Sequence, residues 1–189
     1  MVKFLCSATK KDQFPVTEKE IVFVGRSNVG KSSLINALYN QKLAYVGKTP
    51  GKTRLINFFD VDGLYTAVDV PGYGYARRSQ KEAVDYANMM DDYFTRENKI
   101  RLVIMIVDSR IGLTDDDKDM KEYLKDKHLN YVIAANKIDK LSNNQLNNNK
   151  RLFFNEEENV VYVSAEKKKN LEGLREYIRK YTDLPLSER

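Results

Sequence analysis

The chain has 189 residues, of which 42% are hydrophobic and 31% are charged, and this composition excludes an intrinsically disordered protein. The single cysteine, Cys6, excludes an internal disulfide, and no apolar run approaches the roughly 20 residues of a membrane-spanning helix. The formal net charge of +5 at pH 7 suits an acidic partner without requiring one. We therefore expect one domain over residues 1–189, in a cytoplasmic monomer with no membrane association.

Short β-rich runs alternate with helical patterns along the chain, which favours an α/β fold with a mostly parallel sheet. A short N-terminal extension precedes residues 21–24, which are continuously apolar and predict a buried central strand. Residues 33–38 have helical spacing. The polar residues 41–54, which contain Pro50, predict a long loop.

Two strand-like runs, residues 55–61 and 64–70, flank Asp62-Gly63 and predict an antiparallel hairpin at the sheet edge. Thr114 and Asp117 further on have the spacing of a helix start. The remaining predicted elements, in chain order, are a helix over residues 82–96, a strand over 102–107, a helix after Thr114, a strand over 131–135, a short Asn-rich helix from Asn143, a strand over 160–163 and a helix over 171–181.

One motif follows the first predicted strand directly and precedes the first predicted helix. Gly25-Arg26-Ser27-Asn28-Val29-Gly30-Lys31-Ser32 matches the pattern G-x-x-x-x-G-K-[ST] in full. Its backbone N–H groups and the helix N-terminus that continues through Ser33 predict a phosphate cradle. Lys31 is expected to reach the β- and γ-phosphates, and the Ser32 hydroxyl is expected to ligate Mg²⁺. An ordinary glycine-containing turn is the disfavoured alternative.

An acidic residue ends the second strand of the hairpin, within Asp69-Val70-Pro71-Gly72. Asp69 is where a Walker-B aspartate holds Mg²⁺, often through water. The N–H of Gly72 is expected to approach the γ-phosphate. This short motif is a common turn by itself, and its place about forty residues after the phosphate loop strengthens the assignment.

The nucleotide base is predicted by Asn136-Lys137-Ile138-Asp139 at the end of a buried strand. Guanine offers two donors, N1–H and the 2-amino group, and the Asp139 carboxylate can accept from both. Adenine would leave Asp139 buried and unpaired, so discrimination of roughly 10⁴ is expected. Ser164-Ala165-Glu166 follows the last strand, whose final residue Val163 joins the predicted site, and the Ala165 N–H is assigned to guanine O6.

The long loop contains Thr49-Pro50-Gly51-Lys52-Thr53. A loop hydroxyl there is expected to complete the Mg²⁺ shell only when the γ-phosphate is present, so Gly51, Lys52 and Thr53 join the nucleotide site. Thr53 is the preferred ligand and Thr49 the alternative. The alternative interpretation is a Pro-Gly turn whose threonines have no role in nucleotide binding.

Taken in order, these motifs are those of Ras-like GTPases, and the chain resembles a narrower group, the EngB-type ribosome-biogenesis GTPases. The specific features are Leu55-Ile56-Asn57-Phe58-Phe59 and Gly72-Tyr73-Gly74-Tyr75-Ala76. The resemblance implies a Ras-like P-loop GTPase fold, a six-stranded mostly parallel sheet with one antiparallel edge strand and helices on both faces. It implies GTP hydrolysis to GDP, and as partner the large ribosomal subunit or its precursor, rather than DNA.

Two residues bear on hydrolysis. Ras-like enzymes that orient water with Gln place it directly after D-x-x-G, where this chain has Tyr73, so slow intrinsic turnover is expected. Asn28 occupies a phosphate-loop position at which related GTPases ligate K⁺, which would add positive charge between the phosphates. The alternative is that Asn28 only braces its loop. The expected catalytic group is therefore Lys31, Asn28, Thr53 and Gly72.

Basic residues in the long loop and in the segment after Gly72 offer a surface for RNA phosphates, although a charge run is usually only a solvated face. They are Lys48, Lys52, Arg54, Arg77 and Arg78. Two other functions stay open: a GTPase of another pathway, such as tRNA modification or transport, and a P-loop nucleotide kinase. The kinase is disfavoured because Asn136-Lys137-Ile138-Asp139 is present and an Arg-rich lid is missing.

Overall fold

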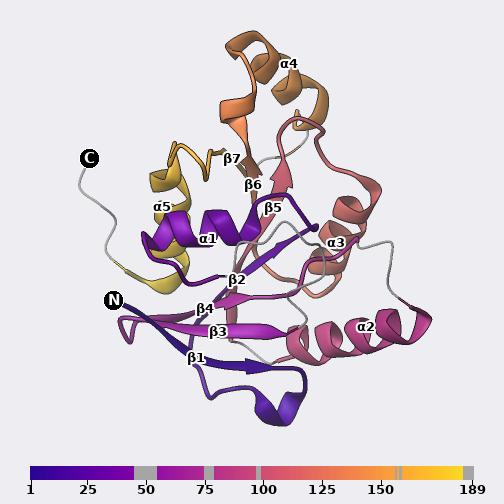
Figure 1. Cartoon of the computed structure of the whole chain (residues 1–189), viewed down its shortest axis with the longest axis vertical. Coiled ribbons are helices and arrows are strands. Elements are labelled where there is room, and N and C mark those ends of the chain that lie inside the picture. The colour runs from indigo at the N-terminus through magenta and orange to yellow at the C-terminus, as the bar shows by residue number, and fades with distance from the viewer. Residues whose placement is uncertain (45–54, 75–78, 97–98, 156, 158, 185–189) are drawn as a thin grey trace.

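The computed structural model describes residues 1–44, 55–74, 79–96, 99–155, 157 and 159–184 (Figure 1). Its centre is a seven-stranded sheet with the strand order β1-β3-β4-β2-β5-β6-β7. The strands are β1 (Val2–Ala8), β2 (Glu20–Gly25), β3 (Ile56–Val61), β4 (Tyr65–Asp69), β5 (Ile100–Asp108), β6 (Tyr131–Asn136) and β7 (Val160–Tyr162). The helices are α1 (Lys31–Tyr39), α2 (Gln80–Phe94), α3 (Asp115–Asp126), α4 (Asn143–Phe153) and α5 (Leu171–Thr182), with short 3₁₀ turns η1 (Lys11–Gln13) and η2 (Ile138–Lys140).

The sheet has one strand more than predicted. β2, β4, β5, β6 and β7 pair in parallel, whereas β3 is antiparallel to both β4 and β1. The predicted hairpin is therefore present as β3–β4, but β1 covers it, and the expectation of a six-stranded sheet with the hairpin at its edge is wrong. The register of β1 shifts between Phe4 and Cys6, so a bulge at Leu5 breaks the alternation by which an edge strand is recognised.

Helices cover both faces of the sheet, as expected. α1 and α5 bury Leu34, Leu38 and Leu174 on one face, and α2 and α3 bury Met90 and Leu124 on the other. Residues 102–107 of β5 are continuously apolar because they alternate between the two core layers, one on each face of the sheet. α4 lies beyond this sandwich at the β7 end of the sheet, and none of its residues is buried (Figure 1).

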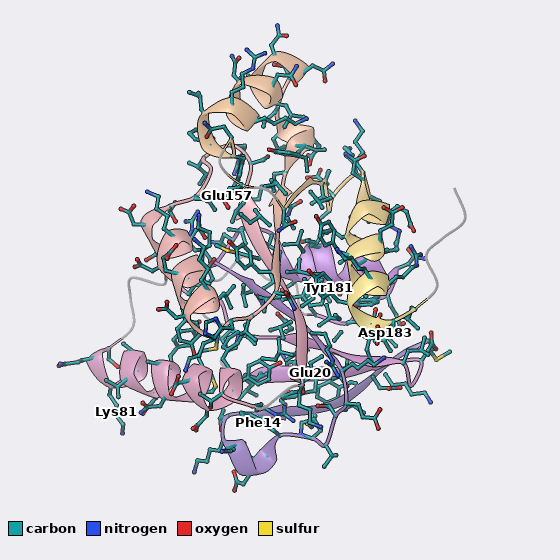
Figure 2. The ribbon with its side chains drawn as sticks, turned by 180° about the vertical axis from the view of Figure 1, so that it is seen from behind. Phe14, Glu20, Lys81, Glu157, Tyr181 and Asp183 are labelled. Atoms are coloured by element: carbon teal, nitrogen blue, oxygen red, sulfur yellow. The ribbon has the colours of Figure 1, made fainter. Side chains whose placement is uncertain are left out.

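A buried ion pair holds the end of α2 to the start of β2. Glu20 is fully buried and lies 2.9 Å from the Arg96 guanidinium, while its other carboxylate oxygen accepts a 2.7 Å hydrogen bond from Tyr93. The Arg96 guanidinium also lies over three rings, those of Phe14, Phe58 and Tyr93. Figure 2 shows Phe14 and Glu20 together at this amino-terminal end of the central strand. This contact lies at the edge of the sheet where β2 begins. The functional site lies at the opposite edge, at the carboxyl ends of the parallel strands.

Candidate functional site

Four strands end at one edge of the sheet, and three of them end with a residue that the sequence assigns to the nucleotide site. These last residues are Gly25 of β2, Asp69 of β4, Asp108 of β5 and Asn136 of β6. β2 lies between β4 and β5. The next two strands in the chain, β3 and β4, lie on one side of β2, and the later strands β5, β6 and β7 lie on the other. Ligands of α/β sheets bind at such a point, outside the carboxyl ends of the strands.

The phosphate loop runs from the end of β2 to the start of α1 at Lys31, as the motif predicts. Gly30 precedes the helix with φ +96°, and a Cβ on it would lie 2.5 Å from Asn136 Nδ2, so both backbone conformation and space require glycine. Asn28 is exposed and has φ +69°, a left-handed conformation that asparagine tolerates. The N-terminus of α1 thus faces the edge where phosphates are expected.

The residues predicted for phosphate and metal, Lys31 and Asp69, are in direct contact. The Lys31 ammonium forms a buried ion pair with Asp69 Oδ1, and the two side chains are 8% and 2% exposed. Ser32 lies in the first turn of α1, next to Lys31. The contact joins the phosphate loop to the end of β4 and brings together a cation for phosphate and an oxygen ligand for Mg²⁺.

Asn136 joins the phosphate loop to the predicted base-binding loop. Its Nδ2 donates to the Val29 carbonyl at 3.0 Å, and its Oδ1 accepts from the Ala165 N–H, also at 3.0 Å. The Ala165 N–H, which the sequence assigns to guanine O6, therefore has a partner within the protein. Val163 is fully buried, and its carbonyl accepts from the Ile138 N–H at 3.2 Å. The predicted loops form one hydrogen-bonded unit.

Asp139 keeps one carboxylate oxygen without a hydrogen bond. Oδ1 accepts a hydrogen bond from the Ser164 hydroxyl. Oδ2 is buried and lies 3.3 Å from Lys140 Nζ, in an ion pair that lacks hydrogen-bond geometry. Burial raises the pKa of Asp139, but the Ser164 hydroxyl and Lys140 outweigh it and lower the pKa overall. An ionised carboxylate with an unfilled acceptor suits the two donors of guanine.

Asp108 belongs to the site and was missed from the sequence. Its carboxylate accepts from Arg110 at 2.9 and 2.7 Å and from Lys137 Nζ at 2.9 Å, and Lys137 Nζ also donates to the Asn28 carbonyl at 2.7 Å. Burial raises the pKa of Asp108, but these cationic donors lower it to about 2. An acid that ends a buried strand was the available signal, since Asp69 was identified in the same way.

The Tyr73 side chain, which stands where Ras-like enzymes place a catalytic glutamine in sequence, is buried against the start of α3. Its hydroxyl donates a 2.9 Å hydrogen bond to Asp117, and its side chain is 7% exposed. Burial and the adjacent Asp117 carboxylate raise the pKa of Tyr73 far above its usual range, so the hydroxyl stays protonated. The preceding Gly72 is packed against the phosphate loop, where an added Cβ would lie 3.2 Å from Ser27 N.

Several predicted residues lie outside the described part of the chain. These are Thr49, Gly51, Lys52 and Thr53 of the long loop and the basic residues Lys48, Arg54, Arg77 and Arg78. Among the residues described here, His, Cys, Asp and Glu form no group of three or more that could hold a metal ion. The predicted Mg²⁺ ligands include hydroxyls, so they are not such a group. No helix in these described ranges is long and apolar enough to cross a membrane.

Comparison with known proteins gives one consistent family. A family model described as 50S ribosome-binding GTPase matches residues 20–137. Two relatives are each described as a probable GTP-binding protein EngB. That of Clostridium beijerinckii is 42% identical over 169 residues, which cover 86% of this chain and 85% of the relative. That of Clostridium perfringens is 40% identical over 183 residues, or 93% of each chain.

Solved structures agree. A crystal structure of a probable EngB covers 87% of this chain and 98% of its own, with 26% identity and a TM-score of 0.64. Era from Aquifex aeolicus, crystallised with GDP and AlF₄⁻, covers 92% of this chain and 59% of its own, with 23% identity and a TM-score of 0.67, and supports the fold alone. The similarities extend over most of the sequence, and the chain therefore belongs to the EngB family of GTP-binding proteins, which have the P-loop GTPase fold.

Proposed function

We propose that this GTPase acts as a nucleotide-controlled switch in assembly of the large ribosomal subunit. The observation that supports this proposal is the joined base and phosphate site. In this site Asn136 links the two loops, and Asp139 keeps one buried carboxylate oxygen without a hydrogen bond. The matched family description, 50S ribosome-binding GTPase, supports the choice of partner. Hydrolysis then removes the γ-phosphate that the long loop (residues 41–54) and Gly72 are expected to contact, and thereby changes the surface presented to the ribosome.

Magnesium fits the residues at this edge of the sheet. Ser32 and Asp69 supply a hydroxyl and a carboxylate, the hard oxygen ligands that Mg²⁺ prefers, and the sequence adds Thr53 as a third. When bound, Mg²⁺ neutralises charge on the β- and γ-phosphates. Lys31 exchanges its ion pair with Asp69 for the phosphates, which frees the Asp69 carboxylate for the metal side of the site. The same exchange keeps both buried charges compensated before and after binding.

We infer that Asn28 binds a second cation, K⁺, beside the phosphates. The exposed Asn28 is fixed by the hydrogen bond from Lys137 Nζ to its carbonyl, which leaves the side-chain amide of Asn28 at the loop surface. We expect phosphate release to be faster in K⁺ than in Na⁺ at equal ionic strength, and Asn28→Ala to abolish the difference. Equal rates of the native protein in both salts would leave Asn28 as a structural residue.

Co-sedimentation with large ribosomal subunits tests the proposed function. We expect tighter binding with a non-hydrolysable GTP analogue than with GDP, and a steep loss of binding with salt, because basic residues meet RNA phosphates. Arg77→Ala with Arg78→Ala should weaken pelleting and leave GTP affinity near native. Arg101→Ala with Arg151→Ala removes the same charge from exposed positions elsewhere and serves as the control.

Each contrary result has its own meaning. Equal pelleting with both nucleotides contradicts a switch, even where salt dependence is steep, because it leaves only a basic protein adhering to RNA. No pelleting at low salt contradicts the ribosomal partner. If the control pair weakens pelleting as much as Arg77→Ala with Arg78→Ala does, the assignment of Arg77 and Arg78 to the ribosome-binding surface is contradicted.

A further inference from the structure

One buried carboxylate, that of Asp117 in α3, joins three segments of the chain. Its Oδ1 accepts from the Tyr73 hydroxyl at 2.9 Å. Its Oδ2 accepts from Arg26 Nε at 3.1 Å and from Thr114, whose N–H and hydroxyl lie at 3.0 and 2.8 Å. The Asp117 side chain is fully buried, so these contacts are made away from water. The carboxylate therefore connects the phosphate loop, the segment after Gly72 and the start of α3.

The backbone of Tyr73 is held to the phosphate loop as well. Its carbonyl accepts a 3.3 Å hydrogen bond from the Ser27 N–H, and Tyr73 forms an isolated parallel bridge with Arg26. Gly72 is close enough to this loop that a Cβ would lie 3.2 Å from both Gly25 O and Ser27 N. Anchoring Tyr73 at its side chain and its carbonyl thus fixes the position of the glycine before it.

A helix cap accounts for only part of this arrangement. Thr114 and Asp117 form the reciprocal cap expected at the start of α3, and that cap uses Oδ2. It does not involve Oδ1, which is occupied by Tyr73, nor does it explain the guanidinium of Arg26 at the same carboxylate. An exposed Asp117 could cap the helix equally well, but the Asp117 side chain is buried and contacts both Arg26 and Tyr73.

We propose that Asp117 and Tyr73 are positioning residues that hold the Gly72 N–H where it meets the γ-phosphate. This inference rests on the proposed function, since it needs GTP at the site. GDP has no γ-phosphate, so loss of the Tyr73–Asp117 hydrogen bond weakens binding of GTP and leaves binding of GDP nearly unchanged. Tyr73 thereby contributes to discrimination between the two nucleotides, although it is buried and does not touch them.

Tyr73→Phe is the direct test, because it removes one hydroxyl and leaves the helix cap intact. We expect affinity for a non-hydrolysable GTP analogue to fall roughly 10-fold, as for loss of a hydrogen bond to a charged acceptor, with GDP affinity within about 2-fold of native. Tyr123→Phe is the matched control in the same helix as Asp117, since its hydroxyl donates at 3.3 Å to Asp91. It should change neither affinity.

Asp117→Asn and the double variant complete a thermodynamic cycle. If the two residues act through one hydrogen bond, the double variant binds the GTP analogue no more weakly than Asp117→Asn alone. The inference is overturned if Tyr73→Phe leaves the ratio of GTP-analogue affinity to GDP affinity unchanged, or if it binds the GTP analogue more tightly than the native protein does. A native protein that fails to bind guanine nucleotides would instead refute the proposed function, so the two failures are distinguishable.

Discussion

Removal of the Asn136 side chain should break the link between the two nucleotide-binding loops. Asn136→Ala leaves the Val29 carbonyl and the Ala165 N–H without their partner, and both residues are buried. An unsatisfied buried backbone group costs about 1–3 kcal/mol, so two of them cost roughly 2–6 kcal/mol in the native arrangement. The loops avoid part of this cost by separating in the free protein and must close again when nucleotide binds.

We therefore expect GDP affinity to fall about 100-fold, which corresponds to about 2.7 kcal/mol. The assay is equilibrium titration with a fluorescent GDP, together with urea unfolding of the nucleotide-free protein. Asn130→Ala is the matched control, because Asn130 precedes the other end of the same strand and donates a single exposed hydrogen bond of 3.4 Å to the Arg101 carbonyl. GDP affinity of Asn136→Ala within about 3-fold of native would refute the reasoning.

Three further predictions concern stability, metal binding and pH. Arg96→Met leaves Glu20 buried without its cation and should lower the free energy of unfolding by about 3–5 kcal/mol with little change in GTP affinity; a loss below about 1 kcal/mol in urea contradicts it. Lys31→Ala should weaken GTP binding at every Mg²⁺ concentration, whereas Ser32→Ala should shift the Mg²⁺ dependence; an unchanged Mg²⁺ titration for Ser32→Ala contradicts its role. The folded pKa of Asp108, about 2, lies below its unfolded value, so its stabilisation is present above about pH 4 and is lost as pH falls toward 2. Asp108→Asn should flatten the acid unfolding curve in that window, and identical curves contradict this.

Local motifs predicted most of the residues that meet at the candidate site, because each motif combines spacing with a chemical requirement. The phosphate loop needs glycine at Gly30 and a cation at Lys31, and both are visible over eight residues. Asn136 ends a buried strand and Asp139 follows it, and the parallel sheet brings them to the same edge as the phosphate loop. The hairpin and the helix starting after Thr114 were likewise predicted from turn and cap residues.

Long-range partners were not predictable in the same way. β1 is an edge strand whose bulge disrupts alternation, and its partners in β3 lie 48 to 59 positions further along the chain. Asp117 has the sequence features of a helix cap, but its contact with Tyr73 spans 44 positions and is visible only in three dimensions. Lys31 and Asp69 were each assigned to a ligand, and their pairing with one another follows from β2 and β4 being neighbours.

Competition binding with the native protein and Asp139→Asn tests the central claim most directly. Asp139 has the unfilled carboxylate oxygen that we assign to guanine. The native protein should bind GTP orders of magnitude more tightly than ATP, because adenine cannot donate to Asp139. Asp139→Asn should lose GTP affinity and gain affinity for xanthosine triphosphate, since an amide donor suits the 2-oxo group. Equal affinity of the native protein for ATP and GTP would contradict the account, as would an Asp139→Asn variant whose base preference is unchanged.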